Sequence, residues 1–370
     1  MNTIPVNVTL RERLRERNNS LNILRLMLAS LVIVGHAWPL TGSNTEPRLE
    51  FISHVAVDAF FVISGYLVSA SRVSANLLVY TWRRILRIFP GLVVCLTITA
   101  GVAAPLAAWV AGTSLSWPSA LNYVAKGSLL LNRQWGIDGT LTAVPYPNAW
   151  NGSLWTLQFE FLAYVMLAAL LTLPWVRRHS TFAIPALSIV AIISWAMAPG
   201  LLNIHTNFYL SALRLGSYFL TGVAFFFLSP HIRIRPVVSA ASALILIGLS
   251  FLGIAGNIGQ IPLAYLLLQI GSLSTSSPFT KTDVSYGVYI YAWPIQQLLA
   301  LCGSASWGVI VNSLLTLVLT LPIAWLSWTF VEKPMLRFKE VMGARKKSGG
   351  VELVTTAPQS TLASGAEPRA

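Results

Sequence analysis

The sequence has little charge, because only 10% of its 370 residues are Asp, Glu, Lys or Arg while 55% are hydrophobic. A soluble domain carries about 25% charged residues, so this scarcity excludes an ordinary water-soluble fold and predicts an integral membrane protein. The net charge of +13 could suggest nucleic-acid binding. The cations fall in short clusters between apolar runs, however, as residues that flank membrane spans do. We therefore expect membrane lipids and not nucleic acid as partners.

Cysteine is also scarce, and no metal-ligand spacing is present. Cys95 and Cys302 both lie in apolar runs, where they are expected to be inert packing residues. The spacing of His36 and His54 means little because the two lie on different expected helices, so no metal is expected. Residues 1–20 are basic like the start of a signal peptide, but the apolar run that follows has no small-residue cleavage site.

Long apolar runs divide the chain into helices of membrane-spanning length, about 20 residues each. The expected spans are 21–40, 54–71, 88–111, 153–174, 181–198, 207–228, 236–255, 260–273, 284–302 and 309–331. About ten spans with both termini inside place every basic cluster on one side, which the positive-inside rule assigns to the cytoplasm. The sequence therefore predicts an all-α, polytopic protein of the cytoplasmic (inner) membrane.

Three regions follow from this division. Residues 1–20 are expected to form an amphipathic segment on the cytoplasmic surface, residues 21–335 the transmembrane domain, and residues 336–370 a basic tail whose end cannot bury a core. Residues 112–152, the longest non-apolar stretch, are expected to form an outward-facing cap. A basic cytoplasmic loop is expected before the third span, at Arg72, Arg83, Arg84 and Arg87.

The first span carries one cation, Arg25, and one imidazole, His36. At ~1.5 Å per residue they lie roughly 16 Å apart along the helix. Because an ionisable group inside a span is costly and usually functional, we interpret this helix as the wall of a tunnel. Arg25 would lie at its cytoplasmic mouth and His36 in its outer half. The alternative is a snorkelling anchor and a hydrogen-bonded core histidine.

Two carboxylates, Asp58 and Glu160, are expected in the same outer half. A carboxylate beside a neutral imidazole is the usual arrangement of a general base, because it fixes the tautomer and stabilises the imidazolium. Asp58 could instead serve a helix N-terminus, whereas Glu160 lies well inside an apolar run. The sequence leaves open which of the two assists His36.

The cytoplasmic end of the expected tunnel is cationic. Arg84 and Arg87 would share a helix face at i, i+3 and could form a fork for phosphates, with Arg25 and Tyr286 at the same level. Positive-inside anchoring alone is the alternative explanation for these arginines.

Several motifs occur together and in order along the chain. After Arg25 and His36 come VDAFFVISGYLVS (57–69), RRILRIFP (83–90), SLWTLQFEFLAYV (153–165), DVSYGVYIYAWPIQQ (283–297) and FVEKP (330–334). Each is weak by itself, but in this order, spread over residues 20 to 335, the set resembles the acyltransferase family 3 membrane proteins.

The resemblance implies an enzyme that passes an acyl group, usually acetyl from cytoplasmic acetyl-CoA, to a hydroxyl of a polysaccharide or glycolipid outside. By position, His36 corresponds to the family's essential histidine and Arg25 to its paired arginine. Arg84 and Arg87 correspond to the Arg-x-x-Arg thought to hold the CoA phosphates. Many members have a histidine where this chain has Ala292, which excludes a mechanism that needs that second histidine.

We therefore expect an O-acetyltransferase of exopolysaccharide biosynthesis with His36 as general base. Direct transfer and an acyl-protein intermediate both stay open. A transporter or flippase of a glycolipid is the competing class, with Arg25, His36 and Glu160 as its path. It would predict matched halves with broken helices, which the sequence lacks. A non-catalytic scaffold would leave these buried groups without a purpose.

Overall fold

The computed structural model of the chain describes residues 8–15, 19–44, 49–131, 133–198, 200–201, 204–273 and 282–340. Within these ranges the protein is built from helices and contains no strand; an isolated antiparallel bridge joins Thr9 to Arg233. The expected all-α fold is confirmed.

Most of the helices follow one another with short connections, but one long segment, residues 129–154, links two of them. In order they are α1 (Leu10–Arg15), α2 (Leu21–Thr41), α3 (Phe51–Val73), α4 (Leu77–Ile98), the π turn η1 (Thr99–Ala103), α5 (Ala104–Ala111), α6 (Trp117–Ser128), α7 (Trp155–Leu170), α8 (Pro174–Arg178), α9 (Ser180–Met197), α10 (Asn207–Leu228), α11 (Pro236–Phe251), α12 (Ala255–Ile258), α13 (Gln260–Gly271), α14 (Ser285–Leu301), the 3₁₀ turn η3 (Ser304–Trp307), α15 (Gly308–Ser327), the π turn η4 (Trp328–Glu332), α16 (Lys333–Leu336) and the 3₁₀ turn η5 (Arg337–Glu340).

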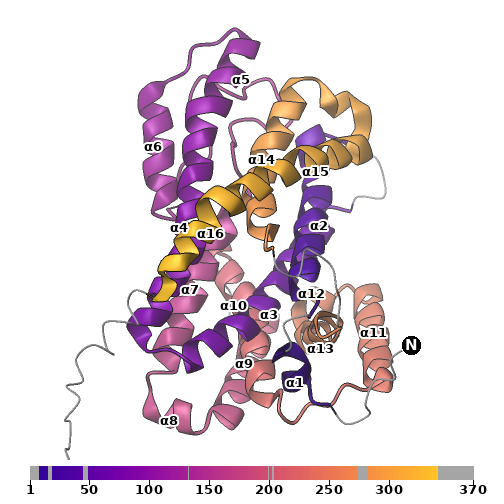
Figure 1. Cartoon of the computed structure of the whole chain (residues 1–370). Helices are drawn as coiled ribbons and strands as arrows, with labels where there is room; N and C mark the ends of the chain where they lie inside the picture. Colours follow the sequence, from indigo (N-terminus) through magenta and orange to yellow (C-terminus); the bar gives the residue numbers. More distant parts are fainter. Residues whose placement is uncertain are drawn as a thin grey trace, which may run out of the picture.

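Helix α3 lies at the centre of the bundle, packed between α2 and α10 (Figure 1). Helices α14 and α15 pack against α2, and α9 covers α10. Helices α11 and α13 form a pair beside this core, while α6 runs alongside α4. Side chains from α2, α3, α4, α7 and α14 therefore converge on the interior of the bundle.

Two glycines allow α3 and α10 to cross with their backbones in contact. A Cβ on Gly65 would lie 2.1 Å from the carbonyl oxygen of Phe219, and one on Gly222 would lie 2.0 Å from that of Val62. Small residues at helix crossings permit this close approach inside membranes, where van der Waals packing replaces the hydrophobic effect. The crossing fixes the position of α3 relative to the rest of the bundle.

Two long helical stretches change pitch at π turns. Helices α4 and α5 are joined by η1, directly before Pro105, which has no backbone N–H to donate. Helices α15 and α16 are joined by η4, just before Pro334, and this turn directs Glu332 inward, where it is 2% exposed. Single π turns of this kind often mark functional sites.

Six of the helical stretches are long and apolar enough to cross a membrane. They are Leu21–Thr41, Phe51–Val73, Leu77–Ala111, Ser180–Met197, Asn207–Leu228 and Ser304–Lys339. Helices α7, α11 and α13 are apolar but shorter. At ~1.5 Å per residue, the 12 residues of α13 extend only about 18 Å, less than a hydrocarbon core of about 30 Å. The protein is thus polytopic, and a count of ten spans with cytoplasmic termini stays a prediction.

The prediction of a basic loop before residue 88 is wrong. Arg72 belongs to α3, and the three later arginines belong to α4, which begins at Leu77. The side chain of Asn76 caps α4 by accepting a hydrogen bond from the backbone N–H of Val79 at 2.9 Å. The expected cap at 112–152 is also partly helical, since it contains α6.

The basic N-terminal segment packs against the helix bundle. Thr9 and Glu12 form a capping box at the start of α1, with the Thr9 N–H donating to the Glu12 carboxylate at 2.8 Å. Leu10 and Leu14 are buried in the same apolar core as the larger helices. The region boundaries at residues 20 and 335 stay predictions, and most of the expected tail, 341–370, lies outside the described residues.

The glycine crossing makes a stability prediction. We expect Gly222→Ala to lower the free energy of unfolding by about 1–3 kcal/mol, because the added Cβ forces α3 and α10 apart. Gly216→Ala is the matched control, since Gly216 lies on the same helix and a Cβ there meets nothing within 4 Å. The midpoint of thermal unfolding in detergent measures both; equal midpoints for the two variants would contradict the close crossing.

Candidate active site

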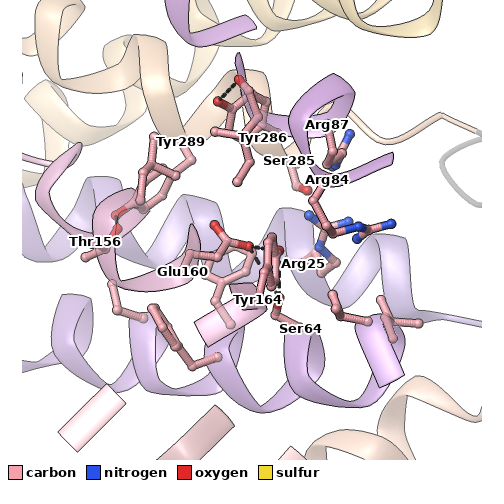
Figure 2. A pocket seen from close by; sticks show the side chains of 17 residues that line it. Arg25, Ser64, Arg84, Arg87, Thr156, Glu160, Tyr164, Ser285, Tyr286 and Tyr289 are labelled. Atoms are coloured by element: carbon pink, nitrogen blue, oxygen red, sulfur yellow. Dashed lines mark hydrogen bonds between the residues drawn. The ribbon is translucent and has the colours of Figure 1, made fainter. Parts of the chain in front are cut away.

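An interior cavity, which we call the arginine cavity, has a volume of about 100 Å³ and is lined by side chains of α2, α3, α4, α7 and α14. Figure 2 shows its layout. Arg25, Arg84 and Arg87 gather at one end, and Thr156 and Tyr289 lie at the other. Glu160, Tyr164 and Ser64 lie between them. The arginines predicted to form a cationic mouth therefore do come together.

Two carboxylates hold the cationic end in place. Asp283, just before α14, forms ion pairs with Arg25 and with Arg87, the latter at 2.5 Å. Glu332, in the π turn η4, lies 3.4 Å from Arg87. Tyr286 donates a hydrogen bond to the carbonyl of Ile88 at 2.7 Å. Four distant segments of the chain are thus joined by one network of charges.

The ionisation of Asp283 follows from its neighbours. Burial alone would raise the pKa of this carboxyl, but the guanidinium groups of Arg25 and Arg87 outweigh burial and hold the pKa well below its usual range. Asp283 therefore stays negatively charged throughout the neutral and mildly acidic range. Its charge keeps two arginines side by side that would otherwise repel each other.

Arg84 differs from its two neighbours. Among the described residues it has no carboxylate partner, and its guanidinium lies over the ring of Tyr164 at 5.6 Å from the centroid. Its buried Nε atom also has no hydrogen-bond partner there. An arginine with uncommitted N–H groups at the end of a cavity is suited to bind an anion such as a phosphate.

His36 lies in a second cavity of about 40 Å³, which we call the histidine cavity. A cavity of this size has room for water or another small group. His54 and Arg214 also line it. A second imidazole is therefore near His36 after all, supplied by α3 and not by position 292.

The local sequence places His36 beside this cavity. Gly35 allows α2 to approach α3, since a Cβ there would lie 2.6 Å from the backbone nitrogen of Ser53. The ring of Trp293 meets the imidazole edge-on at a centroid distance of 4.8 Å. Trp293 is itself held by packing on Gly152 and by donating to the carbonyl of Ala149 at 3.1 Å. The aromatic ring thus limits how the imidazole can turn.

The two candidate carboxylates have other partners than His36. Asp58 forms an ion pair with Arg214 at 2.9 Å. Glu160 accepts hydrogen bonds from Tyr164 and, at 3.3 Å, from Ser64. Among the described residues neither carboxylate is hydrogen-bonded to His36. The structure brings Glu160 to the arginine cavity and Asp58 to the wall near the histidine cavity.

The two cavities share three lining residues, Val57, Thr156 and Tyr289. The Tyr289 hydroxyl lies 2.5 Å from that of Thr156 and donates to the carbonyl of Ser153 at 2.8 Å. This hydrogen-bonded pair forms a thin wall between the arginine end and the imidazole. The structure thus has two adjoining chambers, and a tunnel that connects them stays a prediction.

Sequence reasoning overlooks two charged residues of the site. The hydropathy pattern places Asp283 in a polar linker, although this residue begins the motif DVSYGVYIY. Arg214 lies inside the expected sixth span, and the rule that marks Glu160 marks it equally well. The sequence therefore carries a signal for both residues.

The arrangement defines a polytopic membrane protein with a cationic interior cavity and, in an adjoining cavity, a histidine. Residues 18–329 match the acyltransferase domain family Acyl_transf_3. The chain belongs to this family and is therefore a membrane acyltransferase.

Two curated relatives match nearly the whole chain, and the name of one states an acyl transfer. The chain is similar to the O-acetyl transferase of Shigella phage Sf6, with 28% identity over 335 residues, covering 86% of this chain and 96% of the relative. It is also similar to Nodulation protein 10 of Rhizobium leguminosarum bv. viciae, with 27% identity over 376 aligned residues, covering 89% and 96%. No solved structure matches significantly.

The charge network predicts a stability difference that does not change with pH between pH 8 and the unfolded pKa of an aspartate. Asp283→Asn removes the shared carboxylate, which we expect to cost on the order of 3 kcal/mol. Among the described residues it leaves partly buried Arg25 without a carboxylate and Arg87 with Glu332 alone. Because the pKa of Asp283 is lower in the folded than in the unfolded protein, its contribution is complete above the unfolded pKa of about 4. That contribution is lost only as pH falls towards the folded pKa.

The measurement is the unfolding midpoint of wild type and Asp283→Asn from pH 8 to pH 4. The gap between the two is expected to stay constant over this range. Asp138→Asn, at an exposed carboxyl of the 112–152 segment, is the control and should match wild type. A gap that closes already at pH 6 would contradict the network.

Proposed function

We propose that this protein moves an acyl group, most simply acetyl, from cytoplasmic acyl-CoA to a hydroxyl of a polysaccharide or lipid-linked glycan on the other side of the membrane. The observation that carries the proposal is the pair of adjoining chambers. One has an arginine without a carboxylate partner among the described residues, the other holds His36, and the two share the lining residues Val57, Thr156 and Tyr289.

The arginine cavity is proposed to receive the donor. Arg84 would bind a phosphate group of CoA directly, because its N–H groups have no carboxylate to satisfy within the described residues. Arg25 and Arg87 each carry five N–H donors and can contact a phosphate while remaining paired to Asp283. The acyl arm would extend along Glu160 and Tyr286 towards Tyr289.

His36 is proposed as the general base. It would take the proton of the acceptor hydroxyl while the hydroxyl oxygen attacks the thioester carbonyl carbon. The carbon–sulfur bond then breaks, and the proton passes from the imidazolium to the departing CoA thiolate. Since Asp58 and Glu160 have other partners, the ring of Trp293 takes over the task of orienting His36.

This mechanism assigns separate roles to the two ends of the site. In purified protein we expect Arg84→Ala to weaken acetyl-CoA binding at least tenfold, because a direct charge-assisted contact is lost. We expect His36→Ala to keep donor binding within twofold and to lower acetyl transfer by 10² or more. Donor affinity and transfer to membrane-derived acceptor are measured separately.

Arg83→Ala serves as control, because Arg83 precedes Arg84 on α4 but does not line the described cavity. It should bind the donor like wild type. Wild-type protein that fails to bind acetyl-CoA would contradict the proposed donor, and loss of binding in His36→Ala would contradict the separation of roles.

The wall between the chambers gives a second test. Thr156→Leu places a bulkier side chain against Tyr289, so we expect donor binding to persist while transfer falls at least tenfold. Thr156→Ser keeps the hydroxyl and should retain transfer. The unfolding midpoint checks that the Leu variant is folded. A parallel loss of donor binding would mean that the nucleotide lies beyond this wall.

A further inference from the structure

A wide groove adjoins the histidine cavity and has no role in the donor site. Its volume is about 720 Å³, many times that of the cavity it borders. The two share three lining residues, His54, Trp155 and Arg214. A molecule lying in the groove is therefore next to the chamber that contains His36, on the side away from the arginine cavity.

Aromatic rings form one part of the groove lining. The ring of Phe159 contacts those of Trp155 and Phe208, at centroid distances of 5.7 and 5.2 Å. Trp135 faces the groove from the 112–152 segment and is 41% exposed, and Phe208 is 43% exposed. Exposed rings in a concave surface provide flat apolar faces with polar edges, which suit the faces of sugar rings.

The charge of the groove is positive. Arg133 and Arg214 line it, together with the amides Gln158 and Asn207, and no acidic side chain lines its described part. Arg133 is exposed on the surface. Groups of this kind, arginines and amides without a carboxylate, favour a ligand that carries hydroxyls and at least one negative charge.

Arg214 is held in a fixed orientation at the junction. Its Nε and Nη2 donate to Asp58 at 3.3 and 2.9 Å, and Nη2 also donates to the carbonyl of His54 at 3.1 Å. Within the described residues Nη1 has no hydrogen-bond acceptor. An arginine fixed by a buried carboxylate, with N–H groups remaining, is a preorganised anion-binding group.

We propose that this groove binds the acceptor and selects an anionic glycan, with sugar rings against Trp135 and Trp155 and a negative group at Arg133 and Arg214. The inference rests on the proposed function, since it needs His36 as the base that receives the acceptor hydroxyl. The anionic group is either a sugar carboxylate or a phosphate of a carrier lipid, and both would be recognised by the same arginines.

The test uses exposed groove residues, whose replacement leaves the core intact. Arg133→Gln and Trp135→Ala are compared with Arg178→Gln and Trp109→Ala, which change the same residue types at exposed positions outside the groove. Each full-length variant is expressed in the organism's own membranes in place of wild type. Transfer of labelled acetyl from acetyl-CoA to glycan is measured at limiting and at saturating acceptor, and acetyl-CoA affinity is measured on purified protein.

We expect Arg133→Gln and Trp135→Ala to transfer about tenfold more slowly at limiting acceptor, to recover at saturating acceptor, and to bind acetyl-CoA like wild type. The two control variants should stay within twofold of wild type throughout. Groove variants that behave like the controls would overturn the acceptor site and leave the rings as lipid contacts. Wild-type membranes without any transfer would instead overturn the proposed function.

A second arm identifies the anionic group. Carbodiimide-mediated reduction of the glycan carboxyls should abolish the difference between wild type and Arg133→Gln if a sugar carboxylate is bound. The difference should persist if a lipid phosphate is bound. If a glycan that carries neither group is acetylated equally well, the groove does not select an anion.

Discussion

The ion pairs that Asp283 forms with Arg25 and Arg87 tie three helices together at the cationic end of the site. Arg25 comes from α2, Arg87 from α4, and Asp283 directly precedes α14. Without a shared carboxylate, two guanidinium groups in a poorly hydrated interior would repel each other and draw in water. Glu332 adds a further negative charge because a π turn directs it inward. The relative positions of α2, α4 and the start of α14, which all line the arginine cavity, depend on this balance.

The same device appears at the other end of the path. Asp58 fixes Arg214 beside the histidine cavity, just as Asp283 fixes Arg25 beside the arginine cavity. In both cases a buried carboxylate occupies part of the guanidinium and holds its orientation, while other N–H groups remain. Each end of the path thus presents a cation that does not need to reorganise when an anion arrives, which lowers the entropic cost of binding.

The sequence identified ionisable residues within apolar helices, but not the residues with which they pair. The cost of ionisable groups within apolar runs marked Arg25, His36, Asp58 and Glu160, and all four line or border the two chambers. The partners could not be predicted, because Arg25 and Asp283 are 258 residues apart and their pairing depends on how α2 and α14 pack. Helix α4 shows a second limit, since charge alone suggested a loop where an asparagine cap begins a helix.

The thin wall at Thr156 and Tyr289 has a consequence for side reactions. An activated acyl donor that shares a chamber with a base and water is hydrolysed unless water is excluded. Under the proposed function, the hydrogen bond between the two hydroxyls closes the way from the donor chamber to His36 until an acyl arm presses against it. In this proposal, rotation of the Thr156 and Tyr289 side chains joins the two chambers. Occupation of the donor site, and not a rearrangement of the bundle, would then decide when the base and the thioester meet.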